Sequence, residues 1–167
     1  MNYLHSFKPH PILYLDLHPG NLLISREQLK LIDFDQAALA SLSQERSVCY
    51  GTKGFAAPEQ YEGGTLDERT DIYAIGALLY YMGTGHAPEG EIKAGQGSCR
   101  GDLYILMGRC LRTEKKERCQ SVREVLEALE KLEARIFAER HIPLLRIAAA
   151  GSRSGIGVTH TALGAVR

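Results

Sequence analysis

The sequence predicts a mainly α-helical domain with one small β-hairpin, followed by the start of a separate α/β unit. Two short apolar runs, residues 22–24 and 29–32, are separated by four residues, as in a hairpin. Three later segments carry apolar residues at helical spacing. After Pro143 the pattern changes to an apolar, strand-like run and a Gly/Ser-rich turn. We therefore expect one domain over residues 1–140 and a truncated strand–loop–helix over residues 141–167.

The hairpin places polar side chains at the ends of its two strands. Asn21 precedes the first apolar run, and Asp33 follows the second. The segment over residues 36–59 has little periodicity and is rich in Ser, Gly and Ala, so we expect a long loop. Loops of that length in compact domains are commonly functional.

Each of the three predicted helices has a recognisable boundary. The first begins after Thr70-Asp71, ends at Gly83 and Gly85, and has few charges on any face, which predicts a central, buried helix. The third opens on a capping box at Ser121–Glu124. The apolar periodicity of the three helices covers residues 72–82, 103–111 and 122–136.

Composition and charge exclude several classes of protein. With 44% apolar and 24% charged residues, the 167-residue chain resembles an ordinary globular protein. Twenty basic residues balance twenty acidic ones, which argues against nucleic acid or an anionic membrane as a partner. The four cysteines form no C-x-x-C pair, and no secretory signal or membrane-length apolar stretch is present, so we expect reduced thiols and a cytoplasmic, soluble protein.

Residues 15–21 (L-D-L-H-P-G-N) and 33–35 (D-F-D) resemble two motifs of the protein kinase family. These motifs are the catalytic loop H-R-D-L-x-x-x-N and the metal loop D-F-G. The D-L-x-P-x-N pattern is similar to that of serine/threonine kinases. The resemblance implies a kinase C-lobe that transfers the γ-phosphoryl group of ATP to a protein hydroxyl. Asp16 would then be the catalytic base, and Asn21 and Asp33 would hold Mg²⁺ at the nucleotide.

Further motifs follow in the order expected of a kinase C-lobe. Residues 51–59 (G-T-K-G-F-A-A-P-E) resemble the end of an activation segment, which implies that Thr52 orients the acceptor hydroxyl beside Asp16. Asp71 resembles the residue that braces the catalytic loop. Arg118 resembles the arginine that pairs with Glu59 of the A-P-E motif. The resemblance covers roughly residues 1–137.

Three positions depart from the family pattern. Leu15 replaces the arginine of H-R-D, and Asp35 replaces the glycine of D-F-G. His18 replaces the lysine that steadies the transferring phosphoryl group; a neutral histidine donates a hydrogen bond but lacks a permanent charge. The glycine-rich loop, strand lysine and helix glutamate of an N-lobe are not found in the sequence, which predicts a truncated kinase frame with a missing N-lobe.

The C-terminal segment resembles a second nucleotide-binding motif. Residues 146–159 look like the strand, loop and helix start of a P-loop, similar to partition ATPases. Ser152 and Val158 stand where the first glycine and the lysine belong, so a strand–turn–helix without nucleotide is the alternative.

Two functions from different classes remain open at this point. The first is a serine/threonine protein kinase that depends on ATP and Mg²⁺ and acts on a protein substrate. The second is a pseudokinase-like binding module or inactive fragment, favoured by Leu15, His18 and Asp35. A small-molecule phosphotransferase is disfavoured because the A-P-E segment serves peptide docking.

Overall fold

The computed structural model describes residues 1–42, 51–89, 92 and 101–151. It divides into two compact units, residues 1–132 and 133–167. The predicted boundary after residue 140 falls inside the last helix, α5 (Val122–Gly151).

Helix α3 (Glu68–Thr84) is the centre of the first unit, as its low charge predicts. It begins before the expected Thr70-Asp71 because the Asp67 side chain caps it, accepting a hydrogen bond from the Arg69 amide at 2.9 Å. It ends at Gly85, whose φ of 82° is accessible to glycine. Its buried residues are Thr70, Asp71, Ile72, Ala74, Gly76, Ala77 and Tyr80.

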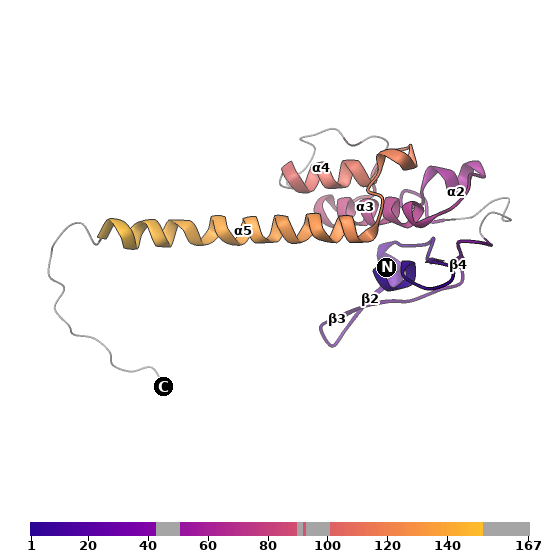
Figure 1. Ribbon diagram of the computed structural model, residues 1–167, viewed down its shortest axis with the longest axis horizontal. Helices are drawn as coiled ribbons and strands as arrows, with labels where there is room; N and C mark the ends of the chain where they lie inside the picture. The colour runs from indigo at the N-terminus through magenta and orange to yellow at the C-terminus, as the bar shows by residue number, and fades with distance from the viewer. Residues whose placement is uncertain (43–50, 90–91, 93–100, 152–167) are drawn as a thin grey trace. The chain divides into compact units, whose positions relative to one another are not determined.

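Helix α4 (Gly101–Cys110) lies along one side of α3, close to its predicted bounds (Figure 1). The approach is close at Gly76, where an added Cβ would lie 2.5 Å from the Cβ of Cys110. Glycine is therefore required at this crossing. A core cluster joins the two helices to the segment before α2 and consists of Phe55, Ala77, Tyr80, Tyr104, Met107 and Leu111.

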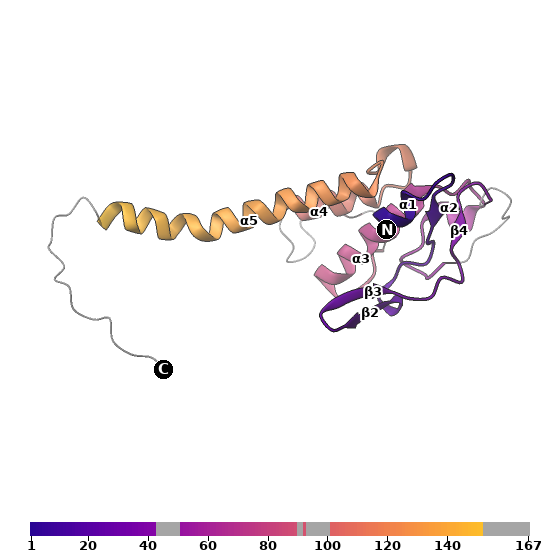
Figure 2. The same ribbon diagram turned by 60° about the horizontal axis from the view of Figure 1, so that its bottom comes forward.

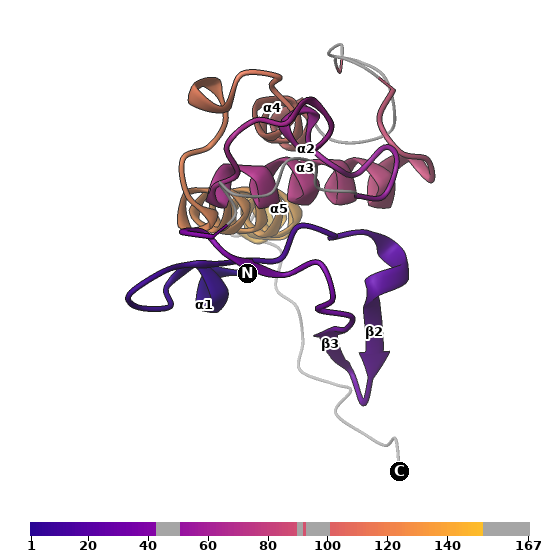
Figure 3. The ribbon, with the colours of Figure 1, turned by 90° about the vertical axis from the view of Figure 1, so that its right-hand side faces the viewer.

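The predicted hairpin is confirmed and lies on the opposite side of α3 from α4 (Figure 3). Strands β2 (Leu22–Ser25) and β3 (Gln28–Leu31) pair antiparallel, with Leu22 opposite Leu31. Each strand extends one residue into the expected connection. The turn is therefore only Arg26-Glu27, whose φ angles of 49° and 61° fit a type I′ turn.

Figure 2 shows the short elements that complete the first unit. Strands β1 and β4 pair antiparallel, with Ile12 opposite Leu39, so the loop predicted over residues 36–59 begins with a short strand and ends in a helix. Among the described residues, the other elements are α1 (Asn2–His5), β1 (Ile12–Leu13), β4 (Ala38–Leu39), α2 (Pro58–Glu62) and the 3₁₀ turns Pro19–Asn21 and Lys115–Glu117.

Helix α5 starts where its capping motif predicts. Ser121 Oγ accepts a hydrogen bond from the Glu124 amide at 3.1 Å. The Glu124 carboxylate accepts from the amide of Gln120, one residue before the position of an ideal capping box. Val122 and Val125 then pack into the core of the first unit.

The strand predicted over residues 144–150 is wrong, because α5 continues as a helix to Gly151. Leu, Arg and Ala are strong helix formers, and a helix already under way needs no new nucleus. The P-loop turn and helix predicted beyond Gly151 lie outside the described residues. Along the described part of the chain, none of the helices combines the length and apolar character needed to cross a bilayer.

Candidate active site

The loop that carries Asp16 is anchored on α3 by one carboxylate. Asp71 is fully buried and accepts hydrogen bonds from the amides of Tyr14 and Leu15, each at 2.8 Å. Its Oδ2 also lies 2.8 Å from Nε2 of His5 on α1. Because a buried carboxylate must be matched by donors, these three groups fix the backbone directly before Asp16.

Leu15 occupies the arginine position of the family motif and faces the core. Its side chain packs with Leu13 and Leu66, and its φ of 67° is unusual for a residue with a side chain. Its carbonyl accepts a hydrogen bond from Nε2 of Gln60 at 2.9 Å, and the Gln60 Oε1 accepts from the Ala57 amide. Gln60 therefore ties α2 to the residue before Asp16.

Two other predicted site residues, Thr52 and Asn21, donate hydrogen bonds to the Asp16 carboxylate. Its Oδ1 accepts from the Thr52 hydroxyl at 2.8 Å and from the Thr52 amide at 3.3 Å. Its Oδ2 accepts from Nδ2 of Asn21 at 3.2 Å, and that same amide nitrogen donates to the Asp16 carbonyl at 3.0 Å. The Asp16 side chain remains about one fifth exposed, so a ligand can reach it.

His18 lies close to Asp16 within the same loop. Its Nδ1 accepts a hydrogen bond from the Gly20 amide at 3.2 Å. In the neutral ring the proton then sits on Nε2, 3.7 Å from Asp16 Oδ2, which is beyond hydrogen-bond length. His18 is thus a neighbour of the carboxylate and packs towards the ring of Phe55.

Asp33 is exposed and sits across the open end of the hairpin from Asn21. The amide of Ile32 donates to the Asn21 carbonyl at 3.0 Å, which continues the pairing one step beyond the strands and places Asp33 directly after the residue bonded to Asn21. Asp33 has a φ of 59°, and its Oδ1 accepts from the Asp35 amide at 3.2 Å. A positive φ at an exposed carboxylate is a strained feature of the kind found at functional sites.

Tyr14 links Asp33 to the Asp16 group. Its hydroxyl donates to the carbonyl of Ile32, beside Asp33. Burial, followed by the negative charges of Asp16 and Asp33, raises the pKa of Tyr14 to about 12. The phenol therefore stays protonated and keeps its hydrogen bond to the Ile32 carbonyl. Both carboxylates lie close enough to raise its pKa.

The donor atoms left open suit a hard cation. Because Nδ2 of Asn21 is turned to Asp16, its Oδ1 is the amide atom that remains for a ligand. Asp33 likewise engages Oδ1 with Asp35 and leaves Oδ2. Mg²⁺ prefers such oxygens and usually keeps waters and phosphates as its other ligands. Among the described residues, no three His, Cys, Asp or Glu side chains form an all-protein metal cage.

Glu59 and Arg118 form a buried clamp behind the site. The guanidinium meets the carboxylate through two hydrogen bonds of 2.7 and 2.8 Å. Its other N–H groups donate to the carbonyls of Arg69, Arg112 and Thr113, so all five donors are used. The Thr70 hydroxyl also donates to Glu59, at 3.0 Å. Helices α2 and α3 and the loop before α5 are thereby joined at one point.

His5, Tyr14 and Gln60 were missed by sequence reasoning although they position the site. His5 contacts Asp71 across 66 residues of sequence, and Gln60 contacts Leu15 across 45. Neither contact leaves a local pattern of spacing. Gln60 follows the A-P-E segment directly, and that position was the one available signal.

Comparisons with known proteins give a family match and several relatives. The family model described as protein kinase domain matches residues 1–141. Serine/threonine-protein kinase A of Synechocystis sp. is 31% identical over 153 residues, which cover 77% of this chain and 29% of that protein. Integrin-linked protein kinase 1 of Arabidopsis thaliana is 31% identical over 168 residues, covering 93% of this chain and 34% of that protein.

A third relative is the DNA damage-responsive serine/threonine-protein kinase RqkA of Deinococcus radiodurans. It is 39% identical over 89 residues, covering 51% of this chain and 13% of that protein. The chain thus spans about a third or less of the length of these relatives. Since the family model extends over most of the sequence and includes every site residue described above, the chain belongs to the protein kinase family.

Proposed function

We propose that this chain is the C-lobe part of a serine/threonine protein kinase that uses ATP and Mg²⁺. The observation that carries the proposal is the convergence of Thr52 and Asn21 on the Asp16 carboxylate. The relatives named as serine/threonine kinases support the same reading.

In this proposal Asp16 accepts the proton of the acceptor hydroxyl. Thr52 holds Oδ1 of the carboxylate from the activation-segment side and leaves the group oriented towards the exposed face. A base fixed in this way contributes through position as well as proton affinity.

Asn21 and Asp33 would hold Mg²⁺ through Asn21 Oδ1 and Asp33 Oδ2. The ion would neutralise charge on the nucleotide phosphates. The hairpin supplies the spacing between Asn21 and Asp33. The backbone hydrogen bond from the Ile32 amide to the Asn21 carbonyl holds Asn21 opposite the residue directly before Asp33. An N-lobe would complete the nucleotide pocket over the exposed apolar side chains of Leu23, Ile32 and Phe34. A fused P-loop domain, a cytoplasmic location and the lack of nucleic-acid or membrane partners stay predictions.

The test is transfer of radiolabelled phosphate from ATP to protein by the full-length protein, with Asp16→Asn as the matched control. The asparagine keeps the size and one oxygen of the side chain but cannot accept the proton. Removal of a general base typically lowers the rate about 100-fold or more. Equal incorporation by the two proteins would exclude the catalytic role of Asp16.

A binding module without phosphoryl transfer is the second candidate. Leu15 supports it, because its side chain is buried among leucines and offers no cation to a phosphorylated loop. His18 supports it as well, since its Nε2 lies 3.7 Å from Asp16 Oδ2, beyond hydrogen-bond length. Calorimetric titration with ATP and Mg²⁺ separates the candidates further: binding lost in Asp33→Asn supports the kinase, and binding unchanged in that variant supports the module.

A further inference from the structure

Two cysteines meet in the core beneath the clamp, outside the proposed active site. Cys110 is the last residue of α4, and Cys119 directly follows Arg118. Both are fully buried, and their sulfurs lie 3.9 Å apart. Apolar side chains surround the pair: Ile72, Leu106, Val122 and Val125.

The two sulfurs differ in acidity because one donates to the other. The hydrogen bond from Cys110 lowers the pKa of Cys119, burial opposes that effect, and the charge of Arg109 adds to the lowering. The same hydrogen bond, together with burial, raises the pKa of Cys110. Cys119 is therefore the better nucleophile of the pair, with a protonated thiol beside it.

Hydrogen bonds already hold the segment between the two cysteines in a closed loop. Arg118 donates to the carbonyls of Arg112 and Thr113, which folds residues 111–118 back towards α4. A disulfide of about 2.05 Å asks the sulfurs to approach by roughly 1.9 Å from their present separation. Cys110 is held against Gly76 of α3, so the movement falls on Cys119 in the loop.

We propose that Cys110 and Cys119 are a redox site that forms a reversible intramolecular disulfide with hydrogen peroxide as the oxidant. The Cys119 thiolate attacks one peroxide oxygen, the O–O bond breaks, and protonation of the leaving hydroxide gives a sulfenic acid and water. The Cys110 sulfur then attacks the Cys119 sulfur, the S–O bond breaks, and the Cys110 proton leaves with the hydroxide as a second water. In sum, two thiols and one peroxide give one disulfide and two waters.

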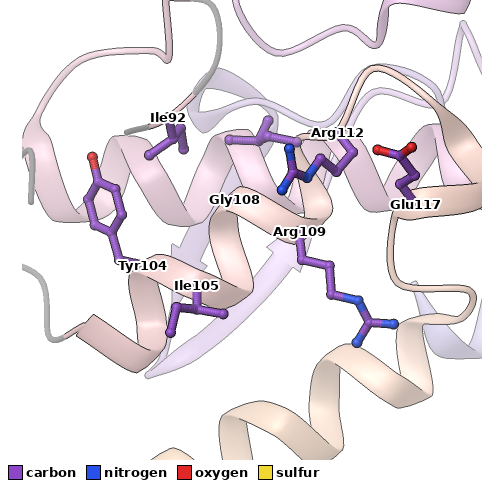
Figure 4. A pocket seen from close by; sticks show the side chains of 8 residues that line it. Ile92, Tyr104, Ile105, Gly108, Arg109, Arg112 and Glu117 are labelled. Atoms are coloured by element: carbon purple, nitrogen blue, oxygen red, sulfur yellow. The ribbon is translucent and has the colours of Figure 1, made fainter. Parts of the chain in front are cut away.

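The position of the pair gives the modification a structural effect. Cys119 adjoins Arg118, so the new bond would tie the residue next to the clamp to Cys110 at the end of α4. A pocket of about 610 Å³ beside the same helix end is lined by Tyr104, Arg109, Leu111 and Arg112, among others (Figure 4). Peroxide is small enough to reach a buried pair through local opening, which larger disulfide oxidants are not. The inference stands independently of the proposed kinase activity.

The test is a peptide map of the folded chain after peroxide and alkylation. Trypsin cuts after Arg109, Arg112, Arg118 and Arg123, so the disulfide would join peptide 110–112 to peptide 119–123. We expect this linked pair as the main product, and its loss on reduction. The urea-unfolded chain is treated in the same way as a control. It shows which peroxide concentration and time are sufficient to oxidise every thiol.

A double variant, Cys49→Ser with Cys99→Ser, is the matched control and must still form the link. We expect the oxidised protein to melt about 5 to 10 °C above the reduced one, because the bond restricts the unfolded chain. Cys119→Ala should abolish both the link and the shift. Recovery of peptides 110–112 and 119–123 as separate alkylated species, at an exposure that oxidises the unfolded chain, would overturn the proposal. So would a link of either cysteine chiefly to Cys49 or Cys99.

Discussion

Arg118 is a buried cation, and the protein supplies a hydrogen-bond acceptor to every N–H group of its guanidinium. The bidentate contact with Glu59 and the three carbonyl contacts need the planar fork of arginine, because a lysine has only three donors at one point. Removing the Arg118 side chain should be costly, because it leaves these acceptors without a donor and Glu59 is itself buried.

We expect Arg118→Met to lower the free energy of unfolding by about 3 to 5 kcal/mol, because it leaves the Glu59 carboxylate buried without its cation. Urea unfolding measures the change. The double variant Glu59→Gln with Arg118→Met should lose less than the sum of the single changes, since both remove one interaction. Strict additivity of the two changes would show that the clamp is not the unit described.

Thr52 offers a finer test of the Asp16 environment. Its hydroxyl lies 2.8 Å from Asp16 Oδ1, and its amide supplies a second, weaker contact at 3.3 Å. If the protein transfers phosphate, Thr52→Ala should lower kcat about tenfold through misplacement of the base, whereas Thr52→Ser should stay near the wild type. Steady-state kinetics of both variants make the comparison, and an equal loss in serine and alanine variants would point to the methyl group instead.

At the scale of an element, α3 depends on the cap that starts it. Burial raises the pKa of Asp67, but hydrogen bonds from Arg69 and Lys115 outweigh it and lower the pKa to about 2. A carboxyl with a lowered pKa stabilises the fold above its unfolded pKa of about 3.9, and that contribution is lost as the pH falls towards 2.

Asp67→Asn keeps the N-cap but removes the charge, so it isolates this contribution. Allowing for the partial exposure of the side chain, we expect the variant to be less stable by about 1 kcal/mol at pH 7 and close to wild type near pH 2. Denaturant unfolding across that range measures the difference. A difference that does not change with pH would assign the effect to the cap and not to the ion pairs.

The crossing of α3 and α4 depends on Gly76 in a different way. A Cβ there would lie 2.5 Å from the Cβ of Cys110, closer than side chains tolerate. Gly76→Ala should therefore cost about 1 to 3 kcal/mol even though alanine is the better helix former. Gly108→Ala on α4, where an added Cβ meets nothing within 4 Å, is the matched control and should be neutral or stabilising. Equal effects of the two substitutions would contradict the crossing.

Over the whole molecule, the sequence predicts local elements well and distant contacts only through family motifs. The hairpin and α3 can be predicted from the spacing of apolar residues and from the residues at turns and helix ends, which are all features of neighbouring positions in the sequence. The Arg118–Glu59 pair could be expected only from the kinase resemblance, because 59 residues separate the partners. The contact of His5 had no motif to reveal it, and that of Gln60 had only its position directly after the A-P-E segment.

The wrong strand over residues 144–150 has a physical explanation. A short apolar run does not by itself distinguish a strand from a buried helix, so the structure of the flanking residues determines which of the two forms. Here α5 is already helical at the upstream end, and three consecutive alanines favour its continuation past Pro143.

Charge also acts on the molecule as a whole. Twenty basic and twenty acidic residues give a sequence isoelectric point of about 7.0. We expect solubility to be lowest near pH 7 and to rise on both sides of it, because molecules without net charge repel one another least. Precipitation with ammonium sulfate at a series of pH values measures this, and a minimum far from neutrality would indicate strongly shifted ionisation in the folded state.

The single carboxylate of Asp71 holds two consecutive peptide N–H groups of a segment that belongs to no helix or strand. Deuterium from the solvent can replace those two hydrogens only when α3 and the loop separate. Tyr14 and Leu15 should therefore take up label as slowly as the interior of the central helix, and report the integrity of the loop that carries Asp16 without any substrate.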